Sequence, residues 1–176
     1  MSSPSIDIEL DSLKDAVSMA LEYAKTLGTS GAEVAISKQQ GLSVSTRMKE
    51  VETVEFNKDG ALGITVFRDG CKGSSSTSDL SKAAIELAVK AADDIARFTS
   101  ADEFNGLAEK SLMATQFPDL DLYHPEDISP EELTRLAVLA EEAALDTDKR
   151  VQTSDGASAN AHSSVKVYGN SHGFLN

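Results

Sequence analysis

The stretch AEVAISKQQGLSVSTRMKEVETVEFNKDGALGITVF, residues 32–67, alternates apolar and polar side chains and decides the fold. A period of two is typical of a half-buried β-strand, because successive side chains point to opposite faces of a sheet. We predict breaks at Gly41, at residues 57–60 and at residues 69–70, where a positive φ has little steric cost and short hairpins form. Residues 32–76 are therefore expected to form an antiparallel meander of four or five strands.

Two helical patterns flank this region. The first predicts a helix over about residues 12–27, capped reciprocally by Ser12 and Asp15 and stopped by a left-handed Gly28. The second begins after Asp79 or Ser81, both of which are plausible caps. Because its apolar positions recur every three or four residues, we expect them to cover the apolar face of the sheet beside the first helix. Its stripe consists of Leu80, Ala84, Leu87, Ala88, Ala91, Ile95 and Phe98.

A third helix is predicted over residues 130–146, after an irregular connector at 99–128. Three features indicate where this helix begins: an N-cap serine, Ser129; a proline at the first helical position, Pro130; and a glutamate three residues after the cap, Glu132. Its expected buried residues are Leu133, Leu136, Ala137, Ala140 and Ala144.

The tail returns to strands at 151–155 and around 165–169. One or two strands cannot bury a face alone. We therefore predict an N-terminal α+β domain over 1–150, with a sheet covered by helices on one face, and the start of a truncated, β-rich second domain over 151–176.

Composition excludes several classes of function. The 176 residues carry a formal net charge of −13, which repels nucleic acid and anionic membrane surfaces. Residues 101–150 are the most acidic part, with 13 acidic and 4 basic groups. No apolar run is long enough to span a membrane, no signal-peptide pattern begins the chain, and the single cysteine cannot form an internal disulfide. A cytoplasmic protein is expected, with no nucleic acid or membrane partner.

Residue types that usually carry catalysis are sparse. The histidines, His124, His162 and His172, lie too far apart for a zinc motif, and no HExxH or HExxxH pattern occurs. Cys71 follows a predicted turn and precedes Lys72, whose charge favours a thiolate, but no histidine is near in sequence. We therefore predict no catalytic residue and no metal ligand or cofactor in this chain.

Six segments together carry a resemblance. In this order and at these distances they resemble the N-terminal part of the TldD/PmbA family, also called modulators of DNA gyrase, and most of all its PmbA (TldE) branch. The resemblance covers about residues 10–176. The segments are AEVAISKQQGLSVSTR, KEVETVEFNKDGALGITVF, KGSSSTSDLS, AADDIARFTSADEFNGLA, PDLDLYHP and GNSHGFLN.

The resemblance implies a subunit of a heterodimeric metallopeptidase that cleaves unfolded or extended peptides, including peptide precursors and antitoxins. In that family the zinc site belongs to the TldD partner, so zinc is expected there and no ligand is carried over to this sequence. The chain itself is expected to be a non-catalytic subunit that binds extended peptide by backbone pairing. Candidate edges are 42–49 and 151–155, and candidate substrate-binding side chains are Arg47 and Phe56.

Two other interpretations remain open at this point. The chain could be a stand-alone acidic adaptor whose helix at 130–146 binds a basic partner, with an affinity that falls steeply as salt rises. It could also be a hydrolase that uses Cys71.

Overall fold

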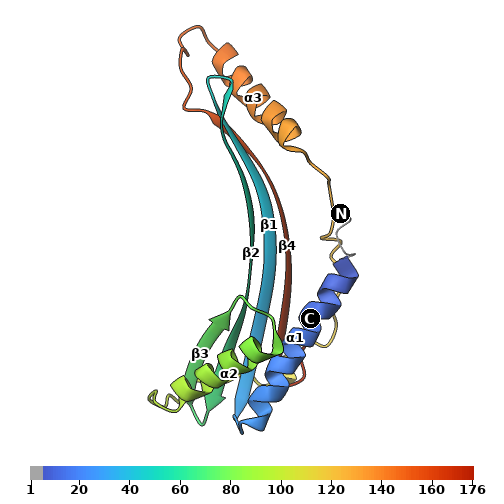
Figure 1. The fold of residues 1–176 in the computed structure, drawn as a ribbon, viewed down its shortest axis with the longest axis vertical. Coiled ribbons are helices and arrows are strands. Elements are labelled where there is room, and N and C mark those ends of the chain that lie inside the picture. The colour runs from blue at the N-terminus through green and yellow to red at the C-terminus, as the bar shows by residue number, and fades with distance from the viewer. Residues whose placement is uncertain (1–5) are drawn as a thin grey trace. The chain divides into compact units, whose positions relative to one another are not determined.

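The computed structural model describes residues 6–176, which form an α+β fold with one four-stranded antiparallel sheet (Figure 1). The order of elements is α1 (Ile6–Thr26), β1 (Gly31–Arg47), β2 (Glu50–Arg68), β3 (Cys71–Thr77), α2 (Lys82–Ala96), a 3-10 turn (Lys110–Leu112), α3 (Pro130–Asp146) and β4 (Ala157–Asn170). Within this part of the chain, no helix is both long enough and apolar enough to cross a membrane.

The strands lie in the order β3-β2-β1-β4. The first three form an antiparallel meander, although four or five strands were predicted within residues 32–76, and the fourth strand of the sheet comes from the tail and pairs beside β1. The turn at Asp69 and Gly70 is confirmed, with φ angles of 50° and 84°. The predicted breaks at Gly41 and at residues 57–60 are wrong, because β1 and β2 run through them without interruption.

A close approach of side chains accounts for Gly41. A Cβ at this position would lie 2.5 Å from Nδ1 of His162 and 2.9 Å from Oδ1 of Asn57. The glycine therefore leaves room for two side chains that lie over β1, and it does not end the strand. The turn that sequence reasoning missed is at Met48 and Lys49, whose φ angles are 51° and 67°.

The helix ends are partly as predicted. The left-handed Gly28 follows α1, with φ at 72°, but α1 begins at Ile6, so the proposed Ser12 cap lies inside the helix and is wrong. Ser81 caps α2, its Oγ accepting from the backbone N–H of Ala84. Ser129 caps α3 through the N–H of Glu132, and the bounds of α3 match the prediction.

The apolar stripe predicted to cover the sheet from α2 is largely wrong. Of its members, Leu87 is 70% exposed, Ile95 is 46% exposed and Phe98, just after the helix, is 90% exposed. The helix turns a neighbouring face to the sheet, and that face consists of Ile85, Ala88, Val89, Ala92, Asp93 and Ala96. Alanines on both faces made the two stripes hard to distinguish from sequence alone.

The chain divides into two compact units. The first unit comprises residues 1–38, 60–119 and 165–176, and the second comprises 39–59 and 120–164. The main hydrophobic core lies in the first unit, where α1 and α2 pack on one face of the sheet. In the strands its members are even-numbered in β1 and β2: Ala32, Val34, Ile36, Leu62, Ile64 and Val66.

The second unit has a much smaller interior. Its buried apolar residues are Val44, Leu133 and Ala137. The prediction that Leu136, Ala140 and Ala144 would also be buried is wrong, since all three are exposed.

The tail differs from its prediction at one end. Residues 151–155 are irregular, and β4 begins only at Ala157. The domain boundary at residue 150 stays a prediction.

Candidate functional site

The outer side of β2 presents a long stretch of strand edge that no other strand of the sheet covers. β3 pairs with β2 only over Leu62–Arg68. Among the described residues, no strand lies on the outer side of residues 50–58, and every one of these residues is exposed. An unpaired strand of this length presents a row of backbone donors and acceptors that an extended peptide can pair with.

The direction of the backbone groups can be assigned. The carbonyl of Phe67 accepts from the N–H of Ser30, just before β1, at 2.9 Å. Backbone groups along a strand alternate in direction, so those of odd-numbered residues of β2 face β1 and those of even-numbered residues face outward. The amides of Val54 and Phe56 therefore face the open side.

The two sequence-predicted binding residues lie in this unit but on different faces. Ser45 and Thr53 share a hydrogen bond of 2.6 Å between their hydroxyls, so odd-numbered residues of β1 and β2 share one face. Arg47, at the end of β1, belongs to that face. Phe56 is 68% exposed and belongs to the opposite face, with its neighbour Val54 at 52%. The two residues do not form one site, and each stays a separate prediction.

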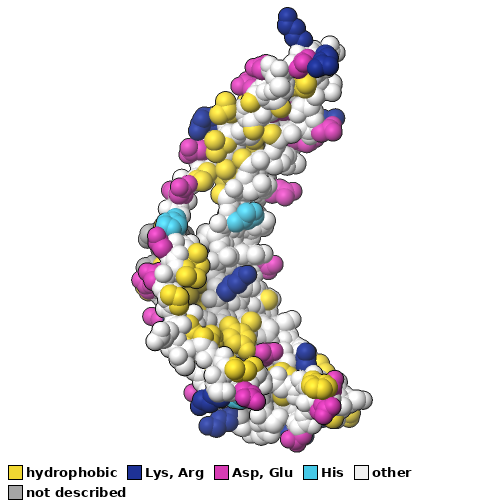
Figure 2. Space-filling view, turned by 180° about the vertical axis from the view of Figure 1, so that it is seen from behind, with side chains coloured by type: hydrophobic (Ala, Val, Ile, Leu, Met, Phe, Trp, Pro, Cys, Tyr) yellow, Lys and Arg dark blue, Asp and Glu magenta, His cyan; other side chains and the backbone are white. Residues whose placement is uncertain are grey.

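Apolar side chains accompany the open edge. Figure 2 shows hydrophobic side chains gathered near the top of the view, where the β1–β2 hairpin and α3 lie in Figure 1. Exposed members in this unit are Met48, Val51, Val54, Phe56, Leu136, Leu139 and Val151. An open edge beside exposed apolar side chains suits an unfolded peptide, which carries both amides and apolar groups.

Both candidate edges named from the sequence need correction. Residues 42–47 lie in β1, which has β2 on one side and β4 on the other. Residues 151–155 form no strand. The error came from placing a break at Gly41, which made residues 42–49 look like a short separate strand.

A buried carboxylate holds the tip of the hairpin in place. Glu141 of α3 is 1% exposed, and its two oxygens accept from the backbone N–H groups of Met48 and Lys49, both at 2.7 Å. Thr46 donates its hydroxyl to the same carboxylate at 3.3 Å. Glu141 thereby joins α3 to a turn whose two residues have positive φ and are not glycine.

This arrangement favours the charged carboxylate. The hydrogen bond from the Lys49 N–H lowers the pKa of Glu141 below its ordinary value of 4.5, against the opposing effect of burial. Further hydrogen bonds from Ser154, Met48 and Thr46 act in the same direction. The buried charge is therefore a structural anchor, and its surroundings make it a poor proton donor near neutral pH.

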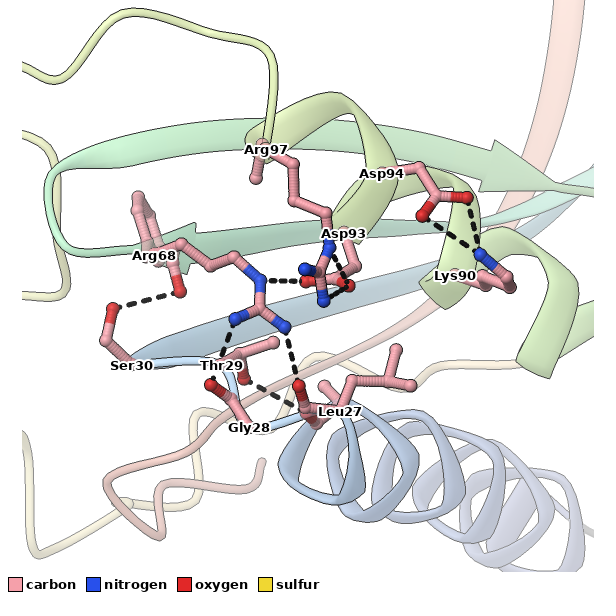
Figure 3. A network of polar contacts seen from close by, with 12 residues as sticks. Leu27, Gly28, Thr29, Ser30, Arg68, Lys90, Asp93, Asp94 and Arg97 are labelled. Atoms are coloured by element: carbon pink, nitrogen blue, oxygen red, sulfur yellow. Dashed lines mark hydrogen bonds and ion pairs between the residues drawn. The ribbon is translucent and has the colours of Figure 1, made fainter.

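A second buried carboxylate organises the first unit (Figure 3). Asp93 of α2 is 2% exposed and accepts hydrogen bonds from Arg68 Nε and, at 2.9 Å, from Arg97 Nη2. Arg68 also donates to the carbonyls of Leu27 and Gly28 at the end of α1, at 2.5 and 3.3 Å. The network joins α1, β2 and α2, and it satisfies carbonyls that a helix end leaves without partners.

Burial alone would raise the pKa of Asp93, but the hydrogen bonds and charges of Arg68 and Arg97 outweigh it and lower that pKa. Paired in this way, Asp93 is suited to stabilising the fold.

The face of the first unit's sheet opposite its helices carries two shallow grooves. One has a volume of about 380 Å³ and the other about 260 Å³, and both are lined by Ala35 and Tyr168. The Tyr168 hydroxyl donates to Glu33 Oε2 at 2.9 Å. Burial, together with the nearby charge of Glu33, raises the pKa of Tyr168. The grooves are open and are lined by small and hydroxyl-bearing side chains, together with Lys166 in the larger groove and Glu33 in the smaller one, and they can accommodate a passing chain.

The candidate metal ligands do not come together. Across residues 6–176, no group of three histidine, cysteine, aspartate or glutamate side chains could hold a metal ion. His124 contacts the carbonyl of Asp121, His162 lies over Gly41, and Cys71 begins β3. The residues described here therefore do not fit a zinc site, and no catalytic step is assigned to them.

Sequence reasoning missed Glu141 and the β2 edge. A signal for Glu141 existed, because Leu133, Ala137 and Glu141 follow one another at intervals of four on one helix face. A charge in that series looked like an interruption of the stripe. The edge could not be found, because it depends on which strand pairs with which.

Long antiparallel strands with two helices on one face of the sheet define the class of α+β protein to which this architecture belongs. The chain belongs to the PmbA/TldD metallopeptidase family. Residues 32–96 match the family model for PmbA/TldA metallopeptidase domain 1, and residues 123–176 match the model for the central domain.

Named relatives agree with this membership. The chain is 57% identical over 163 residues to Metalloprotease PmbA of Escherichia coli O157:H7, and 56% identical to a Metalloprotease PmbA homolog of Haemophilus influenzae. Each match covers 93% of this chain and 36% of the relative, so the chain spans about a third of the length of these proteins.

Solved structures have the same fold. A Bacteroides thetaiotaomicron protein, described as a candidate modulator of DNA gyrase, superposes with a TM-score of 0.82 at 26% identity, covering 93% of this chain and 37% of its own. TldE of Thermococcus kodakarensis gives a TM-score of 0.74 at 18% identity, covering 92% of this chain and 36% of its own, and shows the fold alone. The predicted α+β class and the predicted family are both confirmed.

Proposed function

We propose that this chain is the N-terminal part of a non-catalytic subunit in a heterodimeric, cytoplasmic metallopeptidase of the TldD–PmbA type. Its substrates are unfolded or extended peptides, and zinc is held by a TldD-like partner. Family membership supports the peptidase role. The observation that carries the substrate class is the outer edge of β2, where residues 50–58 are exposed along a side that no described strand covers.

Backbone pairing explains why a broad range of peptides would bind. Each amide of an extended substrate offers the same donor and acceptor, whatever its side chain. The outward groups of Val54 and Phe56 supply the complementary row, and their exposed side chains contact every second substrate residue. Selection then favours peptides that are not folded, because folded chains have their own amides already paired.

Reconstitution tests whether cleavage requires both this protein and a catalytic partner. The full-length protein, a TldD-like partner and a disordered peptide are mixed, and cleavage is followed by mass spectrometry. We expect cleavage by the mixture and by neither protein alone. Full activity from the partner without this protein would remove the proposed role.

Two matched changes test the edge itself. Phe56→Ser should slow cleavage of the peptide, whereas Phe104→Ser, at a residue 87% exposed in the other unit, should leave it unchanged. A peptide with N-methylated backbone amides should also be cleaved more slowly, because methylation removes the donors that strand pairing needs. Equal rates for the methylated and unmethylated peptides would contradict backbone recognition.

A further inference from the structure

The turn between β1 and β2 has a backbone conformation that its own residues do not favour. Met48 and Lys49 form the whole loop, because β1 ends at Arg47 and β2 begins at Glu50. Both loop residues have a positive φ, at 51° and 67°. Two-residue loops with this backbone usually contain Asn-Gly or Asp-Gly, because a larger side chain makes positive φ unfavourable. Contacts from elsewhere in the chain must therefore stabilise this turn.

Glu141 of α3 supplies these contacts. The N–H groups of the two loop residues take no part in the pairing of β1 with β2, and each would need another acceptor. Both donate to Glu141 at 2.7 Å, Met48 to Oε1 and Lys49 to Oε2. Adjacent backbone N–H groups that converge on one anion form a favourable site for a carboxylate. The buried charge therefore stabilises the turn in its strained conformation.

The segment that follows α3 supports the same end of the hairpin. Ser154 donates its hydroxyl to Glu141. Gly156 has a φ of 110°, and a Cβ at this position would lie 2.1 Å from the carbonyl oxygen of Thr46, so the segment lies directly against the end of β1. None of these contacts uses residues 50–58, whose outer side stays open. The turn is thus held without covering the candidate binding edge.

We propose that Glu141 is a positioning residue for peptide binding at the outer edge of β2. This inference rests on the proposed function, which assigns the substrate to that edge. The turn fixes the register and twist of β2 on β1, and Val54 and Phe56 follow it within the same strand. An edge whose donors and acceptors already lie in one row binds an extended peptide without first being ordered. Glu141 does not contact the peptide and acts through the turn.

Residues 50–58 depend on the turn because they have little other support. They pair with β1 alone, since β3 pairs with β2 only over Leu62–Arg68, and every one of them is exposed. A strand with few buried contacts opens locally at a small cost in free energy. Without Glu141 the turn can relax and the start of β2 can separate from β1. A peptide would then have to order this strand as it binds, which lowers its affinity.

Peptide binding to the full-length protein tests the proposal, with a fluorescently labelled, disordered peptide of serine, glycine and leucine as the probe. We expect Glu141→Gln to weaken binding roughly tenfold. Glu142→Gln removes only an exposed ion pair with Lys49 and should change the affinity by less than about twofold. Circular dichroism verifies that the variants fold. Ser154→Ala, which removes one hydrogen bond to the same carboxylate, should weaken binding roughly threefold and replaces Glu141→Gln if that variant does not fold.

A changed turn distinguishes positioning from a general loss of stability in α3. Met48→Asn combined with Lys49→Gly introduces a pair that adopts this turn without help. In that background Glu141→Gln should weaken binding by less than about twofold, because the two changes are coupled through the turn. Equal losses in both backgrounds overturn the proposal, as does unchanged binding by Glu141→Gln in the native turn. A wild-type protein that does not bind the peptide along residues 50–58 overturns the proposed function as well.

Discussion

The two units of this chain are stabilised in different ways. The first unit has a contiguous core of 16 buried residues contributed by α1, α2 and the sheet. In the second unit the buried apolar residues are Val44, Leu133 and Ala137, and the polar side chains of Thr46 and Glu141 are buried there as well. The first unit can therefore rely on hydrophobic burial, whereas the second depends on hydrogen bonds that join α3 to the β1–β2 hairpin.

This contrast has a functional meaning under the proposed role. A unit with a small interior and an open strand edge has apolar and backbone groups left over for a ligand. The price is low local stability, which is typical of regions that bind or move.

Matched leucine truncations compare the two interiors. Leu62 of β2 is fully buried in the first unit, and Leu133 of α3 is 2% exposed in the second. We expect Leu62→Ala to lower the free energy of unfolding by about 4 kcal/mol, since a rigid core cannot close the cavity. Leu133→Ala should cost about 2 kcal/mol, because few neighbours surround it. Denaturant titration measures both, and equal costs would remove the contrast.

Hydrogen exchange shows which of the two units is destabilised by each truncation. Leu133→Ala should speed exchange in α3 and the hairpin while the amides of α1 stay protected. Exchange accelerated equally in both units would show that the chain unfolds as one cooperative block.

Removing the buried charge of Asp93 should be the next largest effect. Asp93→Ala leaves the guanidinium groups of Arg68 and Arg97 without their carboxylate acceptor, and we expect a loss of about 3 kcal/mol. Asp94→Ala, which removes only an exposed pair with Lys90, should cost less than about 0.5 kcal/mol. Thermal denaturation of the two variants measures the difference.

The pH dependence of this contribution has a definite sign. Because the pKa of Asp93 is lowered in the folded state, its contribution is fully present above its ordinary value of 3.8 and is lost as the pH falls through the folded-state value. The difference in the free energy of unfolding between the wild type and Asp93→Ala should therefore be smaller in strong acid than near neutral pH. A gap that stays constant down to that range would contradict the charged network.

Glu141 should control the hairpin without controlling the first unit. Glu141→Gln keeps the size of the side chain but replaces one acceptor oxygen by a donor, so one of the N–H groups of Met48 and Lys49 loses its partner. We expect faster hydrogen exchange at these two amides and in α3. Glu142→Gln, which loses only an exposed ion pair with Lys49, is the control.

Lowering the pH should have the same effect on hydrogen exchange as Glu141→Gln, because protonation also removes the negative charge of Glu141. The lowered pKa means that the anchor is intact above 4.5 and is lost as the pH falls below that value. Hairpin amides should then exchange faster in the wild type, after correction for intrinsic rates, and Glu141→Gln should show no such step. A step of equal size in the variant would assign the effect to another group.

The smallest effect is expected from the helix caps, one in each unit. Ser129→Ala and Ser81→Ala each remove a hydroxyl that accepts from a first-turn amide, at 3.2 and 3.4 Å. Each should cost about 1 kcal/mol. In hydrogen exchange, Ser129→Ala should affect α3 beyond its first turn, whereas the core should restrict the effect of Ser81→Ala to the start of α2. If α3 in Ser129→Ala and α2 in Ser81→Ala frayed over the same number of turns, the proposed difference in packing between the two units would be contradicted.

Local chemistry explains which parts of the fold were predictable from sequence. The bounds of α3 and the Gly28 stop follow from caps and positive φ, which depend on a few neighbouring residues. Continuity of β1 through Gly41 could not be predicted, because the reason for that glycine is a contact with Asn57 and His162 from other strands. The turn at Met48 was hidden for a related reason, since its stabilising carboxylate comes from a distant helix.

The sequence led us to expect a strand edge as the candidate site, but it did not locate that edge. The binding role of Phe56, which is exposed in β2, stays a prediction, whereas both proposed edges were wrong because an edge is a property of strand order. The sequence also could not show which face of α2 is buried, because the helix has two apolar stripes and only its packing on the sheet distinguishes them.

The peptide footprint on the chain is the most direct test of the account. Hydrogen exchange of residues 1–176 is measured with and without an excess of a disordered peptide. We predict slower exchange at the outward amides of Val54 and Phe56, with little change in α1. Slowed exchange confined to the edge of β3, or none along residues 50–58, would contradict the claim that β2 offers its free edge to extended chains.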